Sequence, residues 1–158
     1  MALILMCLAL VLGSAFGASE DPTVYLVRHA EKSSGPDPVL TEQGRVRAER
    51  LAVQLADAGI TQIYSTDYRR TTQTAAPLAE TLGIGITPYD PFDLSALSEV
   101  LRTKGETALV VGHSNTIPVL AELLSGEPQE PIEEAEYDRL YAISLGDGRL
   151  MMLVAGSH

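Results

Sequence analysis

The sequence has little cysteine, little positive charge and no tryptophan. Cys7 is the only cysteine, and aromatic residues make up 5% of the chain. A single cysteine excludes an intrachain disulfide framework and any zinc site built on paired cysteines. Lysine and arginine number 11 against 21 acidic residues, which gives a formal charge of -10. This balance argues against a nucleic-acid partner and against polybasic binding to anionic lipid. Any anionic substrate therefore needs a local concentration of positive charge.

No apolar run is long enough to span a bilayer, which takes roughly 20 residues. Residues 2–12 are apolar and are followed by small residues, including Ala15-x-Gly17. This pattern is typical of a secretory signal, although no lysine or arginine precedes the run. A buried N-terminal helix and an uncleaved anchor are the alternatives. Ile4, Leu5 and Met6 precede Cys7 without the small residue expected before a lipidated cysteine. We therefore predict a signal peptide at 1–18, a single domain at 19–158, secretion or a periplasmic location, and no membrane span after cleavage.

Beyond residue 22 short β-branched runs alternate with helical patterns. The predicted strands are 23–27, 62–64, 84–88 and 108–111, and the predicted helices are 41–58, 67–82, 94–102 and 117–124. Pro77 is expected to interrupt or bend the second helix. Two last strands, 140–144 and 150–154, flank the turn Gly146-Asp147-Gly148 and predict a hairpin. The pattern predicts a three-layer α/β/α fold, whose mainly parallel sheet carries an antiparallel C-terminal edge hairpin.

Three polar clusters follow predicted strands directly. They are Arg28-His29-Ala30-Glu31, Ser65-Thr66-Asp67-Tyr68-Arg69-Arg70 and Gly112-His113-Ser114-Asn115. Ligands of open α/β sheets bind beyond the carboxyl ends of the strands, so these clusters should meet there. Each cluster alone has an ordinary structural interpretation. Together they place two histidines and two arginines at one crevice, an arrangement that is costly without an anion.

Other chemistries fit these residues poorly. A metal site would have two histidines and only carboxylates besides, with no spacing typical of zinc ligands. The segment around Ser114 lacks the Gly-x-Ser-x-Gly turn of serine hydrolases. A P-loop is absent from the sequence.

The same residues resemble the motifs of a known family. Arg28-His29-Ala30 resembles the Arg-His-Gly/Ala signature of the histidine phosphatase superfamily, which has the phosphoglycerate mutase-like fold. Three further segments match that family's motifs in the right order: Leu40-Thr41-x-x-Gly44, Ser65 to Arg70 with Gln73-Thr74-Ala75, and Gly112-His113-Ser114. The resemblance extends from about Val24 to Leu124.

The resemblance implies a phosphatase that needs no metal or other cofactor. His29 would attack phosphorus and form a phosphohistidine, while Arg28, Arg70 and His113 bind the phosphoryl group, His113 as a cation if it is protonated. Ser65 and Asn115 would add neutral hydrogen bonds. The proton donor to the leaving group has no clear motif: Asp90 and Asp93 are the leading candidates and Glu31 a weaker one.

The short segments around the expected site bear on the substrate. Short segments after His29 and around Asp90 leave no room for a cap, which favours a phosphatase over a mutase because a mutase must exclude water. The substrate is expected to be a phosphorylated small molecule, an envelope sugar phosphate among them, or a phosphorylated macromolecule. A protein phosphohistidine phosphatase and a non-catalytic phosphate-binding module are the alternatives. The sequence does not determine the oligomeric state.

Overall fold

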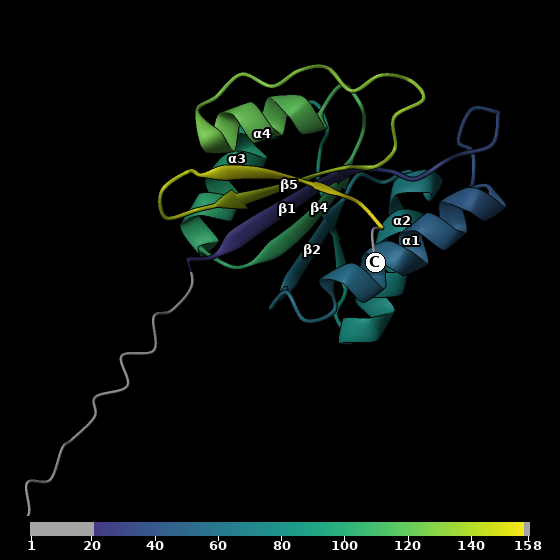
Figure 1. Ribbon diagram of the computed structural model, residues 1–158, viewed down its shortest axis with the longest axis horizontal. Helices are drawn as coiled ribbons and strands as arrows, with labels where there is room; N and C mark the ends of the chain where they lie inside the picture. The colour runs from purple at the N-terminus through teal and green to yellow at the C-terminus, as the bar shows by residue number, and fades with distance from the viewer. Residues whose placement is uncertain (1–20, 157–158) are drawn as a thin grey trace, which may run out of the picture.

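A computed structural model describes residues 21–156 of the chain (Figure 1). The predicted signal peptide, Cys7 and the C-terminal His158 lie outside the described residues. Strands and helices alternate along the described chain in the order β1 (Thr23–Arg28), α1 (Glu42–Leu55), β2 (Gln62–Ser65), α2 (Arg69–Leu82), β3 (Ile86–Pro88), α3 (Leu94–Lys104), β4 (Ala108–Gly112), α4 (Ile117–Ser125), β5 (Arg139–Ser144) and β6 (Leu150–Val154).

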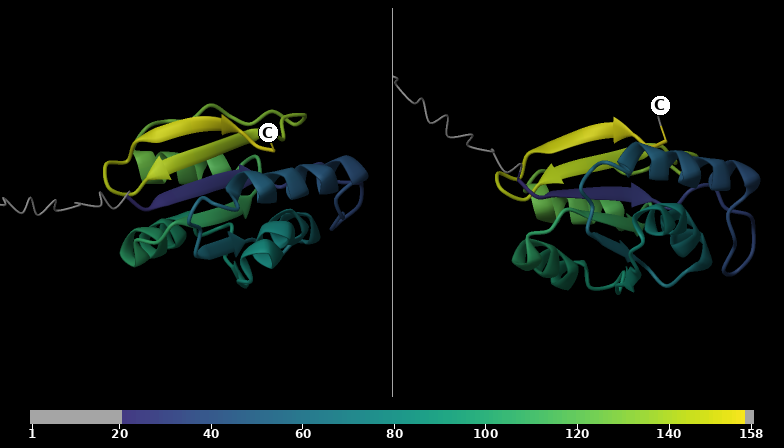
Figure 2. Two further views of the ribbon diagram at one scale, coloured as in Figure 1. Left: turned by 60° about the horizontal axis from the view of Figure 1, so that its bottom comes forward. Right: turned by 90° about the horizontal axis from the view of Figure 1, so that it is seen from below.

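The strands form one six-stranded sheet in the order β3-β2-β4-β1-β5-β6. The first four of these strands are parallel, and β5 and β6 are antiparallel to their neighbours. The predicted fold class is therefore confirmed, including the antiparallel hairpin at one edge, which Figure 2 shows from two further sides. Ser65 and Val27 both pair with Val111, so β2, β4 and β1 end level with one another.

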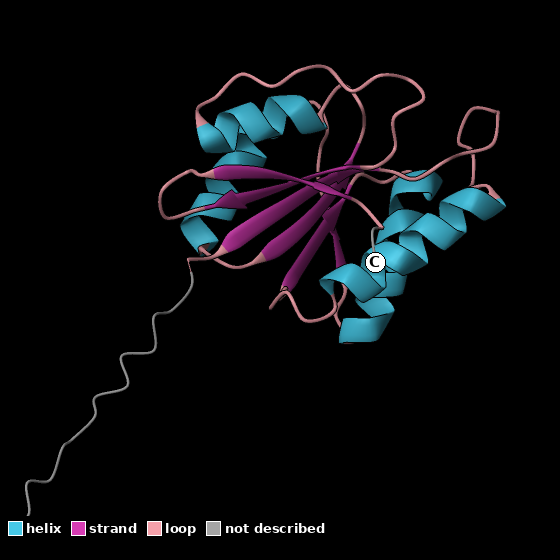
Figure 3. Ribbon diagram, in the orientation of Figure 1, coloured by secondary structure: helices cyan, strands magenta, loops and turns pink. Residues whose placement is uncertain are grey.

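Helices cover both faces of the sheet (Figure 3). Val24 and Leu26 of β1 pack into a core with Leu120 of α4, whereas Val27 packs with Leu51 of α1 on the other face. The central strand β4 is apolar from Ala108 to Val111 and fully buried, as expected for a parallel strand with both faces covered. None of the helices between residues 21 and 156 combines the length and apolar character that a bilayer span requires.

The helix ends follow local hydrogen bonding. The Thr41 hydroxyl accepts a hydrogen bond from the Gly44 amide and so starts α1 at Glu42. The helix α2 continues through Pro77 to Leu82, so the predicted interruption does not occur. A proline removes one backbone hydrogen bond, and the buried residues Ala75, Leu78 and Ala79 on either side of Pro77 pack that part of the helix onto the core.

Candidate active site

A pocket of about 320 Å³ lies beyond the carboxyl ends of the central strands. Its walls come from the segments after β1, β2, β3 and β4 and from the segment before β5: Arg28, His29, Lys32, Tyr68, Arg70, Pro91, Phe92, His113, Ser114, Asn115, Thr116 and Glu134. The structure thus brings Arg28, His29, Arg70, His113 and Asn115 together. This is the meeting of segments that the strand-end argument predicts.

His29 is held in one orientation by two hydrogen bonds. Its backbone amide donates to the Gly112 carbonyl at 2.9 Å, which ties the end of β1 to the end of β4. Its ring Nδ1 lies 2.8 Å from the Ala30 carbonyl oxygen. A carbonyl can only accept, so Nδ1 carries the proton and Nε2 keeps its lone pair.

The surroundings keep the His29 ring neutral. Burial lowers the pKa of His29 to about 3 in spite of the hydrogen bond to Ala30, which raises it. The positive charges of Arg28 and Arg70 lower the pKa further. An unprotonated Nε2 is the state that a nucleophilic imidazole requires.

The Gln73-Thr74 pair fixes the segment that carries His29. The Thr74 hydroxyl accepts a hydrogen bond from the Ala30 amide at 3.0 Å and donates to the Arg70 carbonyl at 2.7 Å. The Gln73 side-chain oxygen accepts a hydrogen bond from the Leu40 amide at 2.9 Å. The first turns of α2 therefore position the nucleophile segment as well as Arg70.

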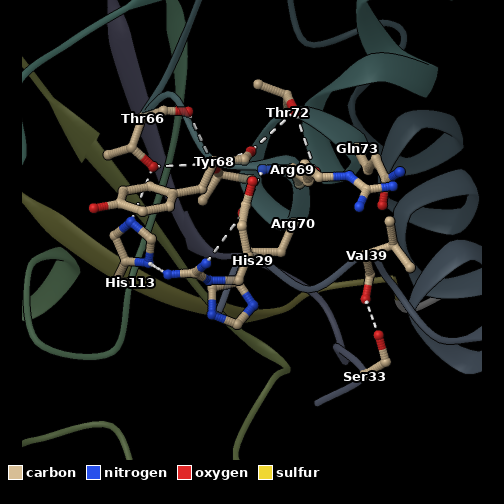
Figure 4. Close-up of polar contacts among 12 residues, drawn as sticks. His29, Ser33, Val39, Thr66, Tyr68, Arg69, Arg70, Thr72, Gln73 and His113 are labelled. Atoms are coloured by element: carbon tan, nitrogen blue, oxygen red, sulfur yellow. Dashed lines mark hydrogen bonds and ion pairs between the residues drawn. The ribbon is translucent and has the colours of Figure 1, made fainter. Parts of the chain in front are cut away.

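Arg70 and His113 contact each other beside Tyr68 (Figure 4). The Arg70 guanidinium lies 4.5 Å from the centre of the Tyr68 ring, and its Nη2 donates to His113 Nδ1 at 3.4 Å. Arg69, the neighbouring arginine, is exposed and does not line the pocket.

A chain of hydroxyl groups holds the opposite side of the His113 ring. His113 Nε2 lies 2.9 Å from the Thr66 hydroxyl, which donates to the Thr71 hydroxyl at 2.9 Å. Thr71 in turn donates to the Thr66 carbonyl. Because Nδ1 accepts from Arg70, the proton of the neutral ring lies on Nε2.

His113 is also neutral in these surroundings. Burial and the charges of Arg70 and Arg28 lower the pKa of His113 to about 4. His113 is therefore not a third cationic donor near neutral pH when no anion is bound. A negative charge in the pocket would favour the protonated ring.

Arg28 has a structural contact as well as a place in the pocket. It is 3% exposed, and its Nη1 donates to the carbonyls of Glu133, Glu134 and Glu136 at 3.0, 2.9 and 2.8 Å. The guanidinium also lies 4.2 Å from the centre of the Tyr137 ring. Arg28 therefore fixes the segment before β5 over the pocket.

Two buried hydrogen-bond donors beside this pocket have no partner among the described residues. They are the Nε atoms of Arg28 and Arg70. An unpaired buried donor on a charged group is costly, and an oxyanion is the ligand that satisfies such donors best. The two arginines thus form a site suited to a phosphate group.

Four other predicted residues lie away from the pocket. The Ser65 hydroxyl is buried and donates to the Thr66 carbonyl, so it is engaged within its own strand end. Asp90 accepts from the Phe92 amide, and Asp93 accepts from the Ala96 amide and caps α3. Glu31 pairs with Arg47 at 2.7 Å. None of the four lines the pocket.

Sequence reasoning missed several residues at the site. Tyr68 lies inside a segment that was singled out, but nothing marks it as a neighbour of Arg70. Phe92, which is 91% exposed at the pocket, follows a proline in an unpatterned loop. Glu134 and Tyr137 lie in a segment without any recognisable motif. Within residues 21–156 no group of three or more His, Cys, Asp or Glu side chains is arranged to hold a metal ion.

The chain matches known proteins in sequence over the first half of the fold. Residues 24–93 match the family model of the histidine phosphatase superfamily (branch 1). A protein of Erwinia tasmaniensis named "Probable phosphoglycerate mutase GpmB" is 34% identical over 71 residues, which make up 40% of this chain and 33% of that protein. The match thus spans only a third of the relative's length.

Solved structures resemble the chain over nearly all of the described fold. A mycobacterial glucosyl-3-phosphoglycerate phosphatase matches with a TM-score of 0.66 at 15% identity, covering 88% of this chain and all of that one. The protein histidine phosphatase SixA, complexed with tungstate, matches with a TM-score of 0.68 at 17% identity and covers 85% of this chain and 97% of its own. At these identities the matches establish the fold. The sequence matches cover less than half of the chain.

Proposed function

We propose that this chain, as a member of the histidine phosphatase superfamily, hydrolyses phosphomonoesters through a phosphohistidine intermediate on His29. One observation carries the proposal: His29 presents an unprotonated Nε2 in the same pocket as the buried Arg28 and the half-buried Arg70. A nucleophile beside two planar cations is the arrangement that phosphoryl transfer to a protein side chain requires.

The reaction proceeds in two displacements. The His29 Nε2 lone pair forms a bond to phosphorus, and the bond from phosphorus to the ester oxygen breaks with its electron pair on that oxygen. Arg28 and Arg70 bind the equatorial oxygens, where negative charge spreads during transfer. A water molecule then attacks the phosphohistidine from the opposite side, and inorganic phosphate leaves with His29 restored.

The surroundings of the pocket favour hydrolysis over transfer between two substrate positions. Phe92 and Asn115 are exposed at the pocket, so the leaving group extends toward solvent and water reaches the intermediate. The substrate class is accordingly a phosphate group on a small molecule or on a larger partner. A protein phosphohistidine substrate is the alternative, because one of the similar structures is named as a protein histidine phosphatase.

Residues 1–18 bear on the choice between these substrates. Their apolar, small-residue pattern supports export, and an exported enzyme would meet extracytoplasmic phosphoesters rather than cytoplasmic signalling proteins. Fractionation of C-terminally tagged protein tests this part of the proposal. Protein found in the cytoplasm with residues 1–18 retained would contradict it.

The test of function is a panel of phosphomonoesters with trapping of the intermediate. Wild-type protein should release phosphate and, on acid quench with labelled substrate, carry acid-labile label. His29→Ala should lose both. Arg69→Ala is the matched control for folding, because Arg69 is exposed and outside the pocket. Full activity in His29→Ala would refute the assignment of the nucleophile. Binding of phosphate without turnover or label would indicate a non-catalytic module.

A further inference from the structure

We propose that Glu134 gives a proton to the leaving-group oxygen in the first step and takes one from water in the second. This inference rests on the proposed phosphatase function and supplies the group that it lacks. A departing alkoxide needs a proton, and neither histidine of the site is placed to give one. Nε2 of His29 is the nucleophile, and the proton on His113 Nε2 points to Thr66.

Glu134 alone among the described residues that line the pocket carries a carboxyl group. The carboxylates expected from sequence are engaged elsewhere: Asp90 and Asp93 accept amide hydrogen bonds in the segment leading into α3, and Glu31 pairs with Arg47. Asp37 approaches Arg70 to 3.7 Å but accepts the Arg69 amide and does not line the pocket.

The backbone that carries Glu134 is fixed to the nucleophile segment. Arg28 precedes His29 and donates from Nη1 to the carbonyl of Glu134 itself at 2.9 Å and to two neighbouring carbonyls. The Glu134 carboxylate lies 3.8 Å from Arg28 Nη2, and its side chain is 85% exposed. A fixed backbone with an exposed side chain leaves the carboxyl room to turn from Arg28 to the ester oxygen of a bound substrate.

A bound substrate changes the contact between Arg28 and the Glu134 carboxylate. Its phosphate group pairs with Arg28 and so competes with the Glu134 carboxylate for that guanidinium, which frees the carboxyl to reach the ester oxygen. The position of the nucleophile and the supply of the proton both depend on one arginine.

The proton balance closes over the two steps. In the first, the electron pair of the breaking bond remains on the ester oxygen, which takes the Glu134 proton and leaves as an alcohol. In the second, the water oxygen bonds to phosphorus, its proton goes to the Glu134 carboxylate, and the pair of the breaking bond returns to His29 Nε2. The cycle ends with the carboxyl protonated as at the start.

The test compares substrates that differ in their need for a proton. A nitrophenolate leaves unaided, whereas an alkyl alcohol such as glycerol does not. General acid catalysis contributes about 10²–10⁴-fold, so Glu134→Gln should lose at least ~100-fold in kcat/KM on glycerol phosphate and less than ~10-fold in kcat/KM on nitrophenyl phosphate, since kcat/KM excludes the second step that both substrates share. Across a series of aryl phosphates, kcat/KM of Glu134→Gln should depend more steeply on the leaving-group pKa than kcat/KM of the wild type does.

Glu133→Gln is the matched control, because Glu133 is exposed in the same segment, contacts Arg28 through its backbone and does not line the pocket. It should retain the wild-type pattern on all substrates. An equal loss on both substrate types, no loss on either, or the same selectivity in Glu133→Gln would overturn the role of Glu134.

The experiment separates this inference from the proposed function. If wild-type protein is active, His29→Ala is inactive and Glu134→Gln behaves as wild type, only the proton donor is wrong. If wild-type protein hydrolyses nothing and forms no phosphohistidine, both proposals fall.

Discussion

Acidification should destabilise this protein between neutral pH and about pH 5, because the fold holds the buried His29 and the half-buried His113 in the neutral form. The pKa of His29 falls from 6.5 to about 3 on folding. Below pH 6.5 the unfolded chain binds a proton at this position that the folded chain does not. Stability is therefore highest above the unfolded pKa and is lost as the pH falls toward the folded pKa.

The linkage relation gives the size of the effect. Between about pH 7.5 and about pH 5, His29 alone should reduce the free energy of unfolding by about 2 kcal/mol. His113, whose pKa falls to about 4, adds a smaller amount because its ring is more exposed to solvent. A loss of ~2 kcal/mol is a large part of the ~5–15 kcal/mol that stabilises a typical domain.

The chosen pH window isolates the histidines from the carboxylates. Burial opposes the shift at Glu31, but its hydrogen bonds to Arg47 hold the pKa below 4.5. The stability that Glu31 contributes is present above pH 4.5 and disappears only at lower pH. Changes above about pH 5 therefore report on histidine.

The assay is urea unfolding of wild type and His29→Gln at both pH values, followed by circular dichroism. The variant cannot bind the proton at position 29 when unfolded, so its loss of stability on acidification should be about 2 kcal/mol smaller than that of wild type. Asn115→Ala, a change at an exposed pocket residue, should keep the wild-type pH dependence. If His29→Gln and wild type lose the same amount, His29 is not held neutral by the fold and the reasoning fails.

Three further predictions concern the phosphate site and the packing below it. Arg70→Ala should lower kcat by about 10²–10³-fold, the range for losing one donor to a transition-state oxyanion, while Arg69→Ala stays near wild type in steady-state assays; equal effects would contradict the assignment. Inorganic phosphate should raise the melting temperature, because at a hundredfold excess over Kd its binding adds about 2.7 kcal/mol to the free energy of unfolding. An undiminished shift of the melting temperature in Arg70→Ala would place the anion elsewhere. Gly112→Ala should cost about 1–3 kcal/mol in urea unfolding, because its Cβ would lie 2.6 Å from the Tyr89 hydroxyl and 2.9 Å from Ile117 Cδ1; unchanged stability would show that the strand end can move aside.

The layers of the fold can be predicted from the sequence because each element has a local signature. The short apolar run ending at Val111 is typical of a strand buried on both faces, and Thr41 marks the start of a helix through its own hydroxyl. The order of the strands in the sheet is harder to predict from the sequence. Placing β5 beside β1 depends on a pairing between residues more than a hundred positions apart, for which no local pattern exists.

The residues of the site also differ in how well the sequence predicts them. His29 and His113 can be found because each follows a strand end directly, where backbone geometry fixes the position of the side chain. Asp93 shows the limit of composition: a carboxylate before a helix is as suitable for capping as for catalysis, and here it caps. Glu134 lies in an irregular segment whose backbone Arg28 holds at the pocket.

Because of the Arg28 contacts, the site is complete only when two distant parts of the chain have folded against each other. The nucleophile segment is among the first parts of the described chain to be synthesised, whereas the carbonyls that Arg28 holds lie 105 to 108 residues later. A partly synthesised or C-terminally shortened chain would possess His29 without a finished pocket around it. Catalytic competence would then appear only once the segment before β5 has docked onto Arg28, so recovery of activity measures that late docking rather than early collapse.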